Sequence, residues 1–95
     1  MKVENITSSN GNKIANQFVI IDDNGNEFFQ SYNSMIAKKV YHNSLNYVVK
    51  TFLDQKYWNY SNTTGKYRNI FLGETIKDTK KKIKSGEYIL TDLNK

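Results

Sequence analysis

Four lysines in the last third of the sequence have the spacing of a binding surface. These four residues, called the lysine stripe below, are Lys77, Lys80, Lys81 and Lys84. Positions i, i+3, i+4 and i+7 of an α-helix lie within an arc of about 100° on one side. Four ammonium groups there can bind successive phosphates of DNA or RNA, or contact an acidic protein surface. The alternative is an ordinary solvated helix face, because Lys82 lies off the stripe and extends the charge around the helix.

Aromatic and basic residues are interleaved between Lys56 and Arg68. Rings placed among cations can stack on unpaired bases while the cations hold the phosphate backbone. The same rings could instead form the core between a sheet and helices. We expect Trp58 and Phe71 to be buried. The residues expected at the surface, where they could bind a partner or nucleic acid, are Tyr57, Tyr60, Lys66 and Arg68.

Motifs for catalysis or metal binding are incomplete. The sequence has no cysteine and a single histidine, His42, which excludes thiolate sites and multi-histidine metal sites. Asn62–Lys66 resembles the end of a phosphate loop, but the first glycine is missing and Tyr67 stands where Ser or Thr is required. Asp22–Glu27 carries oxygen ligands around a glycine, yet it lacks the twelve-residue spacing of a calcium loop, and a hairpin turn explains it. We predict no catalytic residue, no metal and no cofactor, and hence a protein that is not an enzyme.

Length and charge limit the class of protein. A chain of 95 residues forms one small domain with a modest core. The net charge is +5, and residues 51–95 contribute most of it, with eight Lys and one Arg against five acids. The longest apolar run, Phe18–Ile21, has four residues, against about 20 for a membrane helix, and the N-terminus has no apolar signal region. We therefore expect a cytoplasmic protein that does not contact membranes.

The first part of the chain predicts a β-hairpin. Lys13–Ile21 alternates as a strand does, and Glu27–Tyr32 is the returning strand. Between them stands an Asn-Gly pair, the strongest short hairpin signal, because both residues tolerate positive φ. Residues 1–12 form a polar lead-in or a weak first strand near Lys2–Ile6.

A second hairpin is predicted from Met35–Tyr41 and Tyr47–Leu53, with His42–Asn46 as its loop. The alternative is one long helix from Ser34 to Leu53. Clusters of β-branched and aromatic residues disfavour that helix, because such side chains lose rotamer freedom in it.

The last third predicts two short helices. Ser61 or Asn62 can cap a helix over Thr63–Leu72, which Gly73 ends. Its apolar stripe consists of Tyr67, Ile70 and Phe71.

Thr75 and Asp78 fit a capping box for a second helix over Ile76–Ser85, which Gly86 ends. Glu87–Leu93 is then a final strand. Its Tyr88 and Leu90 are expected to face the sheet, with Ile89 as an open alternative.

These elements make an α+β fold. We expect a small antiparallel sheet of two β-hairpins plus a C-terminal strand, packed with two short C-terminal helices. Residues 13–95 form a single domain in this plan.

Three segments resemble a family of small uncharacterised proteins encoded by phages and prophages of low-GC Gram-positive bacteria. They are Phe29–Ala37 (FQSYNSMIA), Lys56–Gly73 (KYWNYSNTTGKYRNIFLG) and Ile83–Tyr88 (IKSGEY). The resemblance spans about Gln17 to Leu93 and implies context, since this family has no established activity. Small phage proteins without enzymatic motifs often bind and block host machinery, or bind nucleic acid as accessory factors.

Two functions follow as hypotheses. The first is a non-enzymatic phage or prophage protein in the cytoplasm of the bacterial host. It would inhibit a nucleic-acid-directed defence system, as anti-CRISPR proteins do, by binding a host defence protein or ribonucleoprotein. The second is an accessory protein that binds DNA or RNA through the lysine stripe and the flanking aromatic residues. A monomer is expected, or a homodimer formed by pairing of exposed strand edges.

Overall fold

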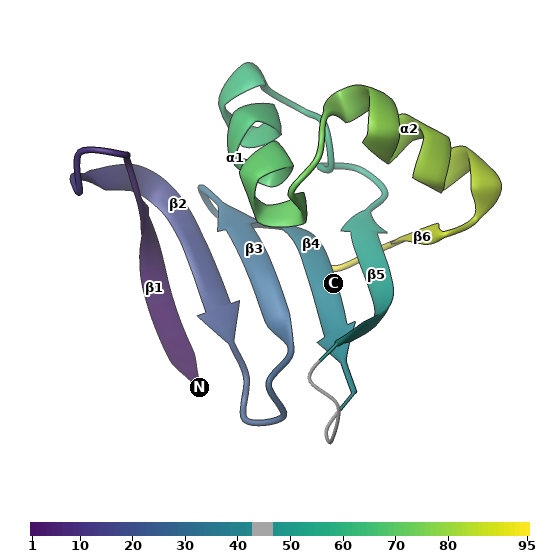
Figure 1. The fold of residues 1–95 in the computed structure, drawn as a ribbon, viewed down its shortest axis with the longest axis horizontal. Coiled ribbons are helices and arrows are strands. Elements are labelled where there is room, and N and C mark those ends of the chain that lie inside the picture. The colour runs from purple at the N-terminus through teal and green to yellow at the C-terminus, as the bar shows by residue number, and fades with distance from the viewer. Residues whose placement is uncertain (43–46) are drawn as a thin grey trace.

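The computed structural model describes residues 1–42 and 47–95, which form a six-stranded sheet and two helices (Figure 1). The strands are β1 (Lys2–Thr7), β2 (Lys13–Ile21), β3 (Glu27–Ser31), β4 (Ser34–Tyr41), β5 (Val48–Asp54) and β6 (Tyr88–Thr91). The helices are α1 (Asn62–Leu72) and α2 (Ile76–Ser85), and both precede β6 in the chain. Neither of these two helices, the ones found in the described residues, has the length and apolar character needed to cross a membrane. The predicted α+β fold is confirmed.

The strands lie in space in the order of the sequence, from β1 to β6. The first five form antiparallel pairs with their neighbours, as short connections require. β6 runs parallel to β5, because α1 and α2 return the chain to the end of the sheet where β5 begins. The sheet is therefore mixed, and the expected antiparallel arrangement holds for β1 to β5 but not for β6.

Both predicted hairpins are present. The turn between β2 and β3 contains Gly25 with φ of 84°, and its amide donates to the carbonyl oxygen of Asp22 at 3.1 Å. The weak first strand also forms, as β1 paired with β2. β4 and β5 replace the alternative of one helix over residues 34–53, which is wrong. Of the predicted hairpin loop, residues 43–46 lie outside the described residues.

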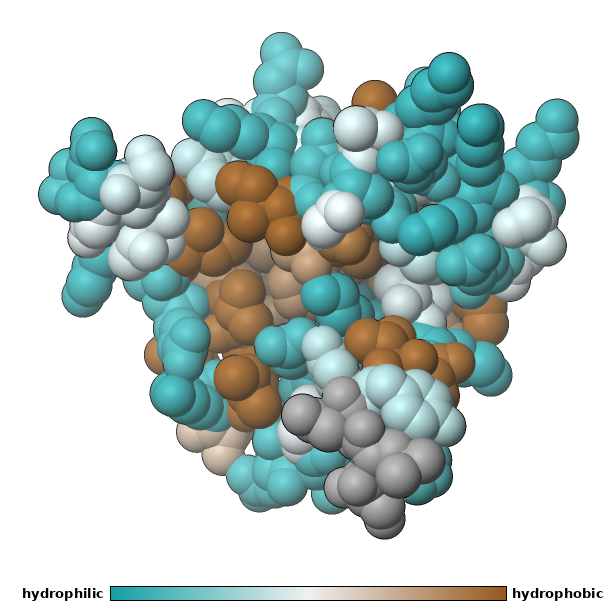
Figure 2. Space-filling view, in the orientation of Figure 1, coloured by the Kyte–Doolittle hydropathy of each residue, from teal (hydrophilic) through white to brown (hydrophobic). Residues whose placement is uncertain are grey.

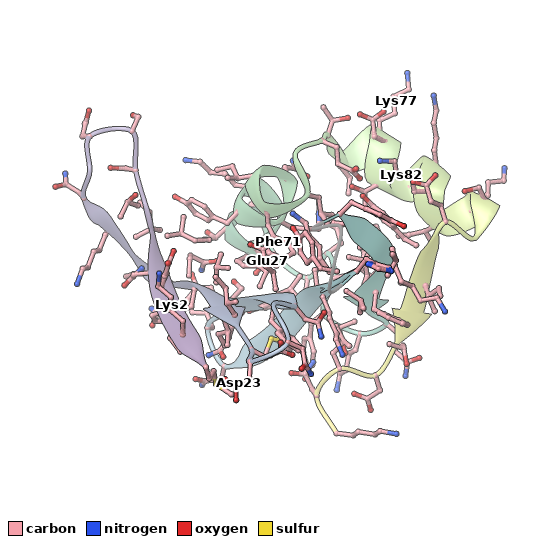
Figure 3. The ribbon with its side chains drawn as sticks, turned by 60° about the horizontal axis from the view of Figure 1, so that its bottom comes forward. Lys2, Asp23, Glu27, Phe71, Lys77 and Lys82 are labelled. Atoms are coloured by element: carbon pink, nitrogen blue, oxygen red, sulfur yellow. The ribbon has the colours of Figure 1, made fainter. Side chains whose placement is uncertain are left out.

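Both helices lie on one side of the sheet (Figures 1 and 3). Phe29, Ala37 and Leu53 are direct cross-strand partners, so they share this face. Phe29 stacks on Phe71 of α1 with ring centroids 5.8 Å apart. Trp58 and Phe71, both expected to be buried, are partly buried and pack against the core. The buried core consists of Phe29, Ile36, Ala37, Leu53, Tyr67 and Tyr88.

Helix caps set the limits of both helices, as predicted. Ser61 Oγ accepts a hydrogen bond from the amide of Thr64 at 3.1 Å, and Thr75 Oγ1 accepts one from the amide of Asp78 at 3.4 Å. Thr64 Oγ1 also lies 2.8 Å from Oγ of Ser31 in β3, which joins the start of α1 to the sheet. Left-handed glycines end the helices at Gly73 and Gly86.

Two apolar residues predicted to face the interior are exposed. Ile70 is 61% exposed, because the face of α1 that turns inward is centred on other positions. With 100° of rotation per residue, Ile70 lies about 60° outside the arc that the inward-facing residues of α1 occupy. Leu90 is 42% exposed, because it lies on β6, the last strand of the sheet. The inward positions of α1 are Thr64, Tyr67, Arg68, Phe71 and Leu72.

Candidate nucleic-acid interface

The lysine stripe occupies the outer face of α2. The opposite face of this helix packs inward, with Thr79 buried and Ile76 and Ile83 partly buried. All four lysines of the stripe are exposed. Figure 3 shows Lys77 on the side of α2 away from the sheet, and Figure 2 shows hydrophilic side chains gathered over α2. The spacing in the sequence therefore becomes one basic surface in the folded protein.

The remaining lysine of α2 has a structural role. Lys82 Nζ lies 2.7 Å from Oε1 of Glu74 and 4.0 Å from Oε2 of Glu87. The hydrogen bond to Glu74 raises the pKa of Lys82, although burial of the amine opposes the effect. Figure 3 places Lys82 on the side of α2 nearer to the sheet. This lysine therefore joins α2 to the rest of the fold and is separate from the stripe.

The charge of the stripe is not compensated within the described part of the chain. No carboxylate there lies within 4.0 Å of a stripe ammonium group. Asp78, the single acid of α2, accepts a hydrogen bond from Thr75 Oγ1 at 3.2 Å at the helix start. Four ammonium groups therefore face solvent on one side of a helix, an arrangement suited to binding phosphates.

Arg68 is buried, and its predicted place at the surface is wrong. The residue is 1% exposed. Its Nη1 donates to the carbonyl oxygen of Trp58 and to Oδ1 of Asn59, both at 2.9 Å. Its Nη2 donates to Oδ1 of Asn69 at 2.9 Å, and the guanidinium lies 5.3 Å from the Trp58 ring centroid. Burial lowers the pKa of Arg68, an effect that Glu74 opposes. The forked donors hold the loop before α1 against the helix, which is a structural role.

The other residues of the aromatic and basic segment lie at or near the surface. The rings of Tyr57 and Tyr60 meet edge to face with centroids 5.5 Å apart, and Lys56 Nζ lies 5.3 Å from the Tyr57 centroid. Tyr60 is 43% exposed, whereas Tyr57 packs partly against the core. Lys66 is exposed, with Nζ 5.4 Å from the Tyr67 centroid. Tyr60 and Lys66 are therefore where they were predicted, and Tyr57 lies at the boundary.

The acidic segment at 22–27 forms a turn. Asp22 Oδ1 accepts hydrogen bonds from the amides of Asn24 at 2.9 Å and Asn26 at 3.0 Å. Desolvation alone would raise the pKa of Asp22, but these hydrogen bonds hold it below its usual value. Among the described residues, no group of three or more His, Cys, Asp or Glu side chains could hold a metal ion.

The face of the sheet opposite the helices is a second surface, which was not predicted from the sequence. Phe28 is on this face, since its neighbour Phe29 contacts α1 and successive strand residues point to opposite sides. A row of direct cross-strand partners crosses all six strands here, and such partners share a face. The row consists of Val3, Ile20, Phe28, Lys38, Phe52 and Ile89. Together with Phe18 and Lys50, which lie two positions from Ile20 and Phe52, we call it the open sheet face.

Lysines lie over two of the rings on the open sheet face. Lys38 Nζ is 5.1 Å from the centroid of Phe28, and Lys50 Nζ is 5.9 Å from that of Phe52. Such contacts contribute about 0.5–1 kcal/mol at exposed sites, whereas a base stacked on an aromatic ring contributes about 1–3 kcal/mol. A flat aromatic group stacked on either ring would therefore be a stronger partner for it than the lysine.

A sequence signal for this surface does exist. Side chains alternate between the two faces along β2, β3 and β5. Phe18, Phe28 and Phe52 therefore face the side opposite to that of their immediate neighbours in each strand. Alternation alone, however, leaves open which face the helices cover.

Comparison with known proteins identifies the family of the chain. No curated protein and no solved structure matches it. The model of a family of unknown function, DUF8033, matches residues 1–89, which include the open sheet face, α1 and α2. The protein therefore belongs to the DUF8033 family.

Proposed function

We propose that this protein is a non-enzymatic nucleic-acid-binding protein that contacts the phosphate backbone through α2. The observation that carries the proposal is the sorting of lysines on this helix. Four stand exposed on one face without a carboxylate partner among the described residues, while Lys82 is held by Glu74. A merely solvated helix needs no such separation of paired and unpaired charges.

Backbone contacts of this kind give affinity without sequence specificity. Each lysine that neutralises a phosphate releases a condensed counterion, so binding weakens steeply as salt rises. The net charge of +5 favours association with a polyanion at long range as well. We therefore expect micromolar binding to both duplex and single-stranded nucleic acid at low salt.

Inhibition of a host defence system by a phage or prophage protein stays a prediction. The positive charge argues against mimicry of DNA, which requires carboxylates at the surface. Contact with the RNA of a ribonucleoprotein would use the same lysine stripe, so nucleic-acid binding is the property to test first.

The test is fluorescence anisotropy of labelled duplex DNA, single-stranded DNA and RNA at several salt concentrations. A variant with all four stripe lysines changed to Glu is expected to bind duplex DNA at least tenfold more weakly, because like charges then face the phosphates. Circular dichroism checks that α2 still forms. Wild-type affinity in this folded variant would overturn the proposal.

A matched control separates the stripe from net charge. The test variant combines Lys80→Glu with Lys81→Glu. The control variant combines Lys13→Glu with Lys95→Glu, which changes the net charge by the same amount. Lys13 and Lys95 are exposed and lie outside α2. The first pair is expected to weaken binding more than the second. Equal losses would show that overall charge, and not α2, determines affinity. If the wild type binds no nucleic acid even at low salt, the partner is a protein.

A further inference from the structure

We propose that the open sheet face is a second binding surface, specific for single-stranded DNA or RNA, on which unpaired bases stack on Phe18, Phe28 and Phe52. This surface lies on the side of the sheet opposite the helices, so its function is independent of the lysine stripe. It shares only the class of ligand with the proposed function.

The spacing of the rings suits separate bases. Phe28 and Phe52 stand in the same cross-strand row with one strand between them, which puts their backbones roughly 10 Å apart. Phe18 pairs with Gln30 and is thus the diagonal neighbour of Phe28, at about 7–8 Å. Each ring can therefore receive its own base, as in sheets that bind single strands by stacking.

The charges of the open sheet face are mainly positive, which fits a polyanion. Asp22, two positions after Ile20, interacts with Lys38, but its carboxylate accepts hydrogen bonds from the amides of Asn24 and Asn26. Lys38 lies between the strands of Phe28 and Phe52, and Lys50 lies two residues before Phe52. Asp54 shares this side of β5, but it is 1% exposed. Its carboxylate accepts hydrogen bonds from the amides of Lys56, Tyr57 and Leu93.

A second copy of the chain is a poorer occupant of this face. Two open sheet faces packed together would bring Lys38 and Lys50 of one copy against those of the other. Such a contact buries like charges, and like-charge juxtaposition disfavours association. A single strand offers both groups that this face can bind, flat bases for the rings and phosphates for the ammonium groups.

A duplex is excluded from this kind of contact. The faces of paired bases are stacked inside the double helix, so only unpaired bases can lie against the rings. Preference for single strands over duplex is therefore the property that separates the open sheet face from the lysine stripe.

The test compares a labelled 12-nucleotide single strand with the matching duplex, using Phe28→Leu combined with Phe52→Leu. Leucine keeps an apolar side chain on the sheet and removes the ring. The variant is expected to bind the single strand at least tenfold more weakly, because two stacking contacts are lost, while its affinity for the duplex stays within twofold. Ile20→Val, which lies in the same row and has no ring, is the control and is expected to change neither affinity.

A second variant keeps the proposal testable if the ring substitutions unfold the sheet. Lys38→Gln with Lys50→Gln changes one partly buried and one exposed lysine and keeps both rings. It is expected to lower single-strand affinity several-fold while duplex affinity stays within twofold. Unchanged single-strand affinity in this variant, or in a folded Phe28→Leu/Phe52→Leu variant, would overturn the proposal. Loss of duplex binding in the α2 variant with single-strand binding retained would support both surfaces, the lysine stripe for the duplex and the open sheet face for the single strand. Loss of both ligands in the α2 variant, with no effect of the sheet variants, would support α2 alone.

Discussion

Glu74 connects α2 to the rest of the fold through its carboxylate. Its side chain is 6% exposed. Its carboxylate accepts hydrogen bonds from Thr79 Oγ1 at 2.6 Å, Lys82 Nζ at 2.7 Å and Tyr88 Oη at 2.6 Å. Burial alone would raise the pKa of Glu74, but these hydrogen bonds outweigh it and hold the pKa below its usual value. Burial and the same contact raise the pKa of Tyr88 to about 12. The charged carboxylate thus joins the turn before α2 to both α2 and β6.

The stability of the protein should therefore fall in acid. An acid whose pKa is lower in the folded than in the unfolded state contributes stability above the unfolded value, and this stability is lost as pH falls through the folded pKa. Glu74→Gln is expected to lower the free energy of unfolding by about 1.5–3 kcal/mol at neutral pH, because charged hydrogen bonds are weakened. Urea unfolding at neutral pH and at successive values below 4.5 measures the difference, which should shrink in acid.

The control for this prediction is Glu87→Gln. Glu87 is 63% exposed and lies 4.0 Å from Lys82, so its substitution is expected to change stability by less than about 0.5 kcal/mol. A Glu74→Gln protein as stable as the wild type, or one whose deficit persists unchanged in acid, would contradict the role given to this carboxylate.

At the scale of elements, α1 has favourable capping residues at both ends and one residue of low helix propensity in its interior. Ser61 and Gly73 define its ends, whereas Gly65 lies within its first turns. Glycine in a helix interior is less favourable than alanine because more backbone freedom is lost on folding. A Cβ at Gly65 would meet Arg68 Nη2 and Asn59 Oδ1 at 3.7 Å, which is ordinary van der Waals contact. The packing of Arg68 therefore leaves room for alanine.

Gly65→Ala is expected to stabilise the protein by about 0.5–1 kcal/mol. Thermal and urea unfolding measure the change. Gly73→Ala is the matched control, because Gly73 has φ of 69°, and it should destabilise by about 1–2 kcal/mol. If Gly65→Ala destabilises instead, the contact between Arg68 and Asn59 must be tighter than the structure shows.

At the scale of the whole molecule, the sheet separates two surfaces of different chemistry. α2 presents four lysines on one side, and the open sheet face presents three phenylalanines and two lysines on the other. β1 and β6 are the two edges of the sheet, where a homodimer by strand pairing stays a prediction. If both bind as proposed, the two surfaces differ in their ligands and in the number of phosphates that they contact.

Salt dependence should report this difference. If each stripe lysine contacts one phosphate, the logarithm of the binding constant for duplex DNA falls with the logarithm of salt with a slope of about −3.6, or about −0.9 per contact. On a single strand, Lys38→Gln with Lys50→Gln should make the slope shallower by about 1.4, at about 0.7 per contact. Anisotropy titrations at a series of salt concentrations measure both slopes. A single-strand slope unchanged by these two substitutions would contradict phosphate binding by the open sheet face.

The elements of this protein could be predicted from the sequence because their signals are local. The limits of α2 follow from Thr75 and Gly86, and the first hairpin follows from its alternation and from Gly25. The lysine stripe follows in the same way, since helical spacing alone puts four lysines on one face.

Tertiary structure alone decided what covers each face. Helical spacing does not show that Arg68 turns inward and Ile70 outward, nor does alternation show that Gln17 is buried while Phe28 lies on the open side. The direction of β6 depends on how α1 and α2 cross the sheet. Such features come from packing between segments far apart in the chain, whereas spacing in the sequence determines only which residues share a face.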